Sequence, residues 1–120
     1  MSVLSRLFGT ATTSVAPADA KELQRVGAVI VDVREKSEWD AGHIPKAKHH
    51  PLRALPSSMG RLPEDRTLIL VCRSGNRSTR ATKALTKAGF DAVNLTGGVT
   101  AWKAAGLPMV NNRGKQGSVR

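Results

Sequence analysis

Four consecutive apolar residues, Leu68 to Val71, run directly into Cys72, the only cysteine of the chain. A short apolar run bounded by turn signals predicts a strand buried on both faces, as in parallel α/β sheets. After a loop that contains Gly75, a helix is expected, with Ser78 or Thr79 as its N-cap. The residues that give its period are Ala81, Ala84, Leu85 and Ala88. Because open α/β sheets bind ligands at the carboxyl ends of their strands, Cys72 stands where a ligand is expected.

The surroundings of Cys72 favour a thiolate. Unpaired N–H groups at a helix N-terminus and the positive end of its dipole stabilise an anion there. Arg73 and Arg77 add two full positive charges. Cysteines in such settings have pKa values of about 3.5–7.5, so the thiolate is present at neutral pH. The plain alternative is a small buried hydrophobic residue, but the coincidence of strand end, glycine loop, helix start and arginines favours the reactive interpretation.

Short strands alternate with helices along the rest of the chain, as the apolar runs and the positions of glycine and proline indicate. This order predicts an α/β fold with a mainly parallel sheet and right-handed crossovers. The expected segments are a helix after Pro17, a strand at 28–32, a helix at 33–42, a strand after Ala47, a weak helical stripe from Leu52 to Leu62, a strand at 90–95 and a helix at 99–105.

A single domain is expected over residues 14–110, because 120 residues suffice for one core. Residues 1–13 are expected to form a flexible N-terminal extension, and the Gly, Asn and basic residues of 111–120 a disordered tail. No apolar run approaches the length of a transmembrane helix, and the N-terminal stretch lacks the pattern of a signal peptide. A cytoplasmic protein is therefore expected.

The net charge of +10 is concentrated in the half of the chain that contains Cys72. Residues 1–60 carry 8 Lys/Arg against 6 Asp/Glu, whereas residues 61–120 carry 11 against 3. Such a field attracts a small anionic substrate or an acidic partner protein. Nucleic acid is not expected, because the chain has only four aromatic residues and no recognisable nucleic-acid-binding motif.

A metal site is not expected either. His49 and His50 are adjacent and point in different directions on a strand, and no cysteine or carboxylate stands at ligand spacing from them or from His43. A single cysteine also excludes an intramolecular disulfide and a cysteine-rich zinc site.

Several blocks of residues stand in a recognisable order. They are Asp32-Val33-Arg34-Glu35, Glu38-Trp39, Gly42-His43-Ile44-Pro45 with Ala47, Cys72-Arg73-Ser74-Gly75-Asn76-Arg77-Ser78, and Gly97-Gly98-Val99 with Ala101-Trp102 and Gly106-Leu107-Pro108. With these blocks, over about residues 16–110, the chain resembles the rhodanese family of single-domain sulfurtransferases. One block alone would be a weak signal, whereas the ordered set is specific.

The resemblance implies a parallel five-stranded sheet flanked by helices, with Cys72 as the carrier of sulfur. It implies a ping-pong reaction in which the thiolate takes the sulfane sulfur of a donor such as thiosulfate, and cyanide or a thiol then takes the outer sulfur of the Cys72 persulfide. Fixed amide dipoles suit both anions, and no metal or organic cofactor is implied. Because the chain has no second cysteine, the sulfur must leave to another molecule.

Loop length separates this reaction from its nearest rival. Phosphatases and arsenate reductases of the rhodanese fold have a loop similar to Cys-x5-Arg, and this longer loop fits a tetrahedral oxyanion. Here the spacing is Cys72-x4-Arg77, and Ser78 stands at the Cys-x5-Arg position. The tighter loop favours sulfur over phosphate.

The resemblance also assigns roles within the loop. Its backbone is expected to cradle the anion, and Ser78 either hydrogen-bonds the persulfide or caps the helix. Arg73 and Arg77 are candidates for holding an anionic donor, the alternative for each being a solvated surface side chain. The expected substrate-binding residues are Arg73, Ser74, Gly75, Asn76, Arg77 and Ser78.

Four residues outside the loop are expected to have structural roles. Asp32 and Arg34 are expected to brace the loop above the sheet, and Trp39 and Trp102 to pack in the interior.

The donor, the acceptor and the oligomeric state stay open. Ser74 and Glu38 stand where two-domain thiosulfate sulfurtransferases resembling this chain carry basic residues, so glutathione persulfide or a protein persulfide is an alternative to thiosulfate. A second function, from another class, is a sulfur-relay module whose basic face docks an acidic partner protein.

Overall fold

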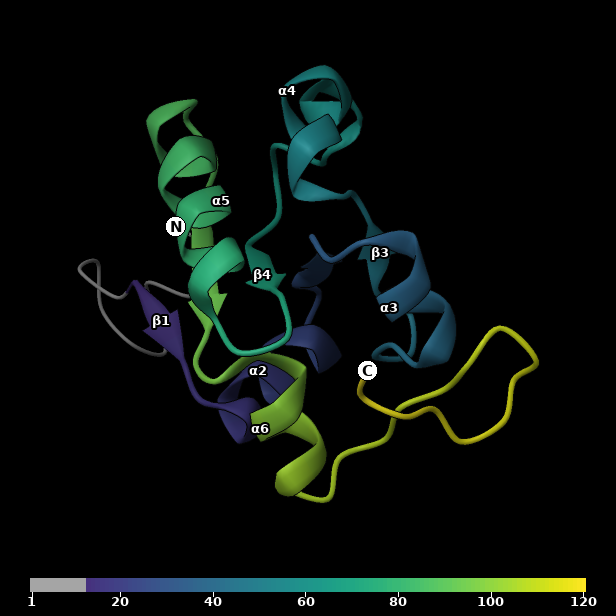
Figure 1. The fold of residues 1–120 in the computed structure, drawn as a ribbon. Helices are drawn as coiled ribbons and strands as arrows, with labels where there is room; N and C mark the ends of the chain where they lie inside the picture. Colours follow the sequence, from purple (N-terminus) through teal and green to yellow (C-terminus); the bar gives the residue numbers. More distant parts are fainter. Residues whose placement is uncertain (1–12) are drawn as a thin grey trace.

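A five-stranded sheet forms the centre of the computed structural model, which describes residues 13–120 (Figure 1). The strand order is β1-β5-β4-β2-β3, and every neighbouring pair is parallel. The expected α/β fold with a parallel five-stranded sheet is therefore confirmed. The strands are β1 (Ser14–Val15), β2 (Val29–Asp32), β3 (Lys48–His49), β4 (Leu68–Val71) and β5 (Ala92–Leu95). The expected N-terminal extension lies, apart from Thr13, outside the described residues.

Helices cover both faces of the sheet, with α2 and α6 together on one side and α4 and α5 on the other (Figure 1). The described helices are α2 (Pro17–Arg25), α3 (Lys36–Ala41), α4 (Leu55–Ser58), α5 (Asn76–Lys87) and α6 (Gly98–Ala104), with short 3-10 helices at Leu52–Ala54 and Met59–Arg61. Within residues 13–120, none of these helices has the length and apolar character needed to cross a membrane.

The position of β4 at the centre of the sheet explains why its sequence is apolar without a break. Ile69 and Val71 pack in the core under α2 and α6, whereas Leu68 and Leu70 pack in the core under α4 and α5. Successive side chains of a strand point to opposite faces, so a strand covered on both faces needs apolar residues at every position. Cys72, directly after β4, belongs to the core under α4 and α5.

Helix α5 begins earlier than the sequence predicts, and both expected N-caps, Ser78 and Thr79, were wrong. Gly75 has φ +115° at the N-cap position, so the chain turns from the loop into the helix at Asn76. Only glycine adopts this left-handed backbone readily. The Thr79 hydroxyl then lies inside the helix and donates to the Gly75 carbonyl at 2.7 Å.

The segment expected to be a disordered tail folds back onto the domain. Backbone N–H groups of Gly117 and Ser118 donate to the carbonyls of Met109 and Ala41, at 3.0 and 2.9 Å. The side chain of Val119 packs against the core under α2 and α6. A Cβ on Gly42 would lie 2.4 Å from the Ser118 carbonyl oxygen, so the absence of a side chain lets the two backbones meet. The glycines that suggest disorder therefore permit close packing.

Candidate active site

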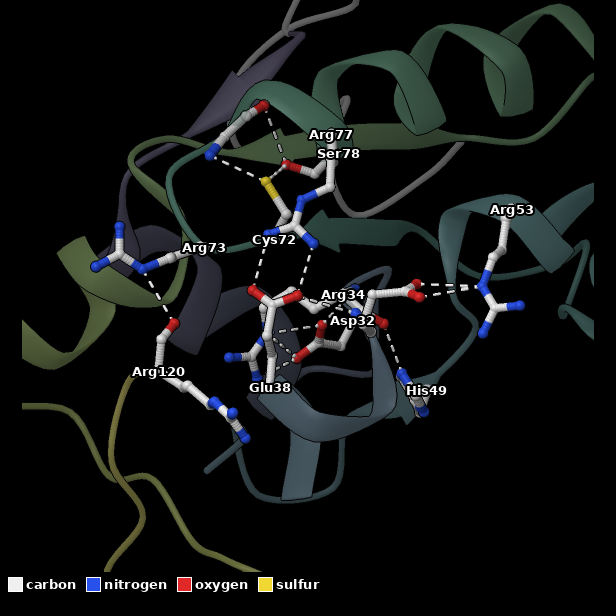
Figure 2. A network of polar contacts seen from close by, with 12 residues as sticks. Asp32, Arg34, Glu38, His49, Arg53, Cys72, Arg73, Arg77, Ser78 and Arg120 are labelled. Carbon is white, nitrogen blue, oxygen red and sulfur yellow. Dashed lines mark hydrogen bonds and ion pairs between the residues drawn. The ribbon is translucent and has the colours of Figure 1, made fainter. Parts of the chain in front are cut away.

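Cys72 opens the loop between β4 and α5 (Figure 2). We call this loop together with the first three residues of α5 the sulfur loop, residues 72–78. The residue is buried, with 1% of its surface exposed. The backbone N–H of Gly75 donates to Sγ at 3.0 Å, and the hydroxyl of Ser78 lies 3.3 Å from Sγ. The loop therefore closes around the sulfur and presents hydrogen-bond donors to it.

The sulfur loop lowers the pKa of Cys72. Burial by itself would raise the pKa of the thiol. The hydrogen bonds from the Ser78 hydroxyl and from the backbone N–H groups of Ser78, Gly75 and Ser74 outweigh burial, so the pKa lies below its ordinary value. Donors fixed in place stabilise an anion without having to reorient. The arrangement suits a thiolate nucleophile.

Helix α6 fixes the start of the sulfur loop from beneath. The backbone N–H groups of Val99 and Thr100 donate to the carbonyls of Cys72 and Arg73, at 2.9 and 3.1 Å. Gly98, with φ +62°, lets the two segments approach, because a Cβ there would lie 2.4 Å from the Cys72 carbonyl oxygen. The sequence indicates the Gly97-Gly98 turn, but nothing in it shows that this turn supports the sulfur loop.

Arg77 is paired with a carboxylate. Its Nη1 and Nη2 donate to the two oxygens of Glu38 at 2.7 and 2.8 Å (Figure 2). The hydrogen bond from Arg77 is the main cause that holds the pKa of Glu38 at about 2. The positive charge of Arg77 is thereby compensated within the protein.

Arg73 projects from the other side of the sulfur loop and is exposed. Its Nε donates to the main-chain carbonyl of Arg120 at 3.0 Å, so the folded-back C-terminal segment reaches the loop (Figure 2). This contact joins residues 47 positions apart in the sequence. The sequence gives no signal for it, since residues 111–120 carry neither an apolar period nor a motif.

Asp32 and Arg34 form a buried ion pair below the site, both with 0% exposure. Arg34 Nη2 donates to Asp32 Oδ2 at 2.8 Å and to the Gly42 carbonyl at 2.6 Å. The pair therefore ties the end of β2 to the turn after α3. Within the described residues, its hydrogen bonds link it to that turn and not to the side chains of the sulfur loop.

Trp39 is stacked between two histidines. Its ring lies 3.7 Å from that of His43 and 4.8 Å from that of His49, measured between ring centres. His43 Nδ1 and His49 Nε2 lie within hydrogen-bond distance of the carbonyls of Trp39 and Arg34. The part of the chain that the structure describes holds no group of three or more His, Cys, Asp or Glu side chains placed to bind a metal ion.

The remaining loop residues face outward. Ser74 and Asn76 are exposed and, with Gly75, line one end of a cavity of about 830 Å³ between α5 and β5. Asn94 of β5 lines the same cavity, and its Oδ1 lies 2.5 Å from the Ser78 hydroxyl. The sequence alone does not indicate a role for Asn94, because a single polar residue in a short strand carries no pattern of its own.

Comparison with known proteins agrees with this fold. The family model described as a rhodanese-like domain matches residues 16–105. That match covers most of the chain, and the protein belongs to the rhodanese-like domain family.

Two relatives have names that include the word sulfurtransferase. A sulfurtransferase of Allochromatium vinosum is 40% identical over 87 residues, which cover 72% of this chain and 81% of that protein. The probable adenylyltransferase/sulfurtransferase MoeZ of Mycobacterium tuberculosis is 47% identical over 76 residues, 61% of this chain. The match covers only 19% of MoeZ, so it concerns one part of a longer protein. Among solved structures, a rhodanese-related protein from Thermoplasma volcanium has a TM-score of 0.78 at 31% identity, with 82% of this chain and 97% of that chain covered.

Proposed function

We propose that the protein is a rhodanese-type sulfurtransferase in which Cys72 carries the transferred sulfur as a persulfide. The observation that supports this most directly is the buried Sγ, with the Gly75 N–H at 3.0 Å and the Ser78 hydroxyl at 3.3 Å. This geometry stabilises an anionic sulfur and lowers the pKa of Cys72. The sulfurtransferase names of relatives at 40 and 47% identity support the same chemistry.

The proposed reaction has two half-reactions. The Cys72 thiolate attacks the sulfane sulfur of the donor, a new S–S bond forms, and the donor's S–S bond breaks. With thiosulfate, sulfite leaves with the electron pair of the broken bond, and the negative charge of the enzyme moves to the outer sulfur. A nucleophile then attacks that outer sulfur. With cyanide as acceptor, thiocyanate leaves and the Cys72 thiolate is restored.

The donor we propose is a small anion that carries a sulfane sulfur, either thiosulfate or a low-molecular persulfide. Arg73 is exposed, whereas Arg77 is paired with Glu38. Of the two loop arginines, Arg73 is therefore the one that can meet an anionic donor without first giving up an ion pair. Ser74 adds no charge at the exposed side of the loop.

A sulfur-relay module that docks an acidic partner protein is the second candidate. Lys83 and Lys87 of α5 are exposed and line the cavity that reaches Ser74 and Asn76. A persulfide-bearing partner with acidic residues could dock along this side of α5. The third candidate, a phosphatase or arsenate reductase, is disfavoured by the short Cys72-x4-Arg77 spacing.

Initial-rate kinetics test the proposal. With thiosulfate and cyanide as the varied substrates, a persulfide intermediate requires ping-pong behaviour, seen as parallel double-reciprocal lines. Sulfite should appear in a stoichiometric burst before cyanide is added, and Cys72→Ser should give neither sulfite nor thiocyanate. Sulfite release that requires cyanide would contradict the mechanism. Slow turnover with every small acceptor, together with salt-sensitive binding of an acidic partner, would favour the relay module.

A further inference from the structure

The hydroxyl of Ser78 is surrounded by more hydrogen-bond acceptors than it can donate to at one time. Its Oγ lies 3.3 Å from Cys72 Sγ, 3.2 Å from the Gly75 carbonyl oxygen and 2.5 Å from Asn94 Oδ1. A serine hydroxyl carries one proton and donates one hydrogen bond at a time in good geometry. The hydrogen bond that lowers the pKa of Cys72 is therefore in competition with the others.

Asn94 is the nearest competitor and is fixed in the sheet. In β5 it pairs with Leu70 of β4 and with Ser14 of β1. Its backbone N–H donates to the Thr13 carbonyl at 2.9 Å. Its side chain lies beside the sulfur loop, since a Cβ built on Gly75 would be 3.7 Å from Nδ2. A rigid strand thus presents an amide to the Ser78 hydroxyl.

We infer that Asn94 is a positioning residue for Cys72: its Oδ1 holds the Ser78 hydroxyl while Sγ is protonated or bonded to an outer sulfur, and gives it up when Sγ is a thiolate. The inference rests on the proposed function for its role in turnover. A thiolate is a much stronger acceptor than a neutral sulfur, because hydrogen bonds to ionised groups are about twice as strong as neutral ones. The hydroxyl therefore turns toward Sγ only in the anionic state.

The turn of the hydroxyl fits the two half-reactions. When the thiolate attacks the donor, Sγ becomes a neutral, disulfide-like sulfur and the charge moves to the outer sulfur. The Ser78 hydroxyl then returns to Asn94 without any buried group losing its partner. When an acceptor removes the outer sulfur, the charge returns to Sγ and the hydroxyl follows it. Asn94 thus stabilises the protonated and persulfide forms relative to the thiolate.

The charged groups near the sulfur do not depend on Asn94 for their positions. From α5, Arg77 is bound to Glu38 of α3. From β2, Asp32 is bound to Arg34. Arg73 is exposed on the far side of the loop, and Lys83 and Lys87 line the same cavity as Asn94. These groups remain when Asn94 is replaced, so a change in the acidity of Cys72 reports on the hydroxyl.

Replacement of Asn94 tests the inference in the resting protein, without any sulfur donor. Asn94→Leu keeps the volume and removes the acceptor, so the acid dissociation constant of Cys72 should rise by about two- to tenfold, the range of one hydrogen bond. Asn94→Asp offers a stronger acceptor and should lower that constant. The pH dependence of thiolate absorbance in the ultraviolet measures the acid dissociation constant of Cys72. The pH dependence of the alkylation rate with iodoacetamide gives an independent value.

The Ser78→Ala background supplies the matched control. There the hydroxyl is absent, so Asn94→Leu should leave the acid dissociation constant of Cys72 unchanged. Thermal unfolding identifies any variant that fails to fold, and Asn94→Ala replaces Asn94→Leu in that case.

Two results would overturn the inference. One is a lower acid dissociation constant in Asn94→Leu, which would mean that the amide nitrogen faces Ser78 and supports its bond to Sγ. The other is the same shift in both backgrounds. Because these measurements need no donor, they are independent of whether a persulfide forms.

Discussion

The carboxylate of Glu38 holds the guanidinium of Arg77 through two hydrogen bonds, at 2.7 and 2.8 Å. Glu38 comes from α3 and Arg77 from the first turn of α5, so the pair links α3 to the sulfur loop. The charge that the sequence offers to an anionic donor is therefore already compensated. We expect both the donor preference and the acid stability of the protein to depend on this pair.

Release of Arg77 should strengthen the binding of an anionic donor. In Glu38→Gln, the charge of Arg77 is no longer compensated, and one such charge contributes about 1 kcal/mol near a solvated site. We expect the KM for thiosulfate to fall by about two- to tenfold. Glu22→Gln, which removes a carboxylate paired with Arg25 on α2, is the matched control for net charge. Equal effects in both variants would show that only the overall charge matters.

The same pair should make stability depend on pH in the acid range. The pKa of Glu38 falls from 4.5 to about 2 on folding, so the folded state favours the ionised carboxyl. The stabilisation is therefore fully present above about pH 4.5 and is lost as the pH falls toward 2. Urea unfolding should show wild type more stable than Glu38→Gln by about 1 kcal/mol at neutral pH. A difference that persists at pH 2 would exclude the ion pair as its cause.

A methyl group at position 98 should disrupt the support of the sulfur loop. In Gly98→Ala the new Cβ would lie 2.4 Å from the Cys72 carbonyl oxygen, at a residue with φ +62°. Gly106→Ala is the control, because Gly106 has φ +78° but no heavy atom within 4 Å of its Cβ position. The backbone strain shared by both should cost about 1–2 kcal/mol of unfolding free energy.

The contact with the loop backbone should add to that cost in Gly98→Ala alone. We expect Gly98→Ala to lose stability beyond Gly106→Ala and to lose sulfurtransferase activity, as measured by thermal unfolding and thiocyanate formation. Equal stability and equal activity in the two variants would show that the close approach has no role.

Deletion of residues 118–120 should weaken donor binding through Arg73. The deletion removes the carbonyl that accepts from Arg73 Nε, so the guanidinium must be ordered each time a donor binds. Ordering one such side chain costs about 0.5–1.5 kcal/mol, which predicts a rise of about two- to tenfold in the KM for thiosulfate. The alkylation rate of Cys72 should not change.

Asn112→Ala is the control for this deletion. This substitution removes the hydrogen bond that Asn112, in the same C-terminal segment, donates to Asp40, away from Arg73. A similar rise in KM in Asn112→Ala would mean that the segment acts only by general packing.

The sequence predicts those features that depend on a run of similar residues or on a residue that favours a turn. The unbroken apolar run Leu68 to Val71 indicates a strand covered on both faces, and Gly75 indicates the turn that follows it. Side-chain pairs across the fold carry no such pattern. Glu38 and Arg77 are 39 residues apart, and their pairing depends on how α3 and α5 are placed.

The C-terminal segment makes contacts that its composition does not indicate, for a related physical reason. Gly117 and its basic neighbours have the composition of a mobile tail, yet glycine also permits the close contact that Gly42 makes with Gly117 and Ser118. Composition alone does not separate these two uses of glycine. Asn94 was missed because its partner, the Ser78 hydroxyl, belongs to a different element.

Intact-mass spectrometry after incubation with a sulfur donor tests the central claim most directly. Wild-type protein treated with thiosulfate or glutathione persulfide should gain the mass of one sulfur atom, and cyanide should remove it. Cys72→Ser should gain none under the same conditions. No added sulfur with any donor, or an equal gain in Cys72→Ser, would contradict the account of Cys72 as the sulfur carrier.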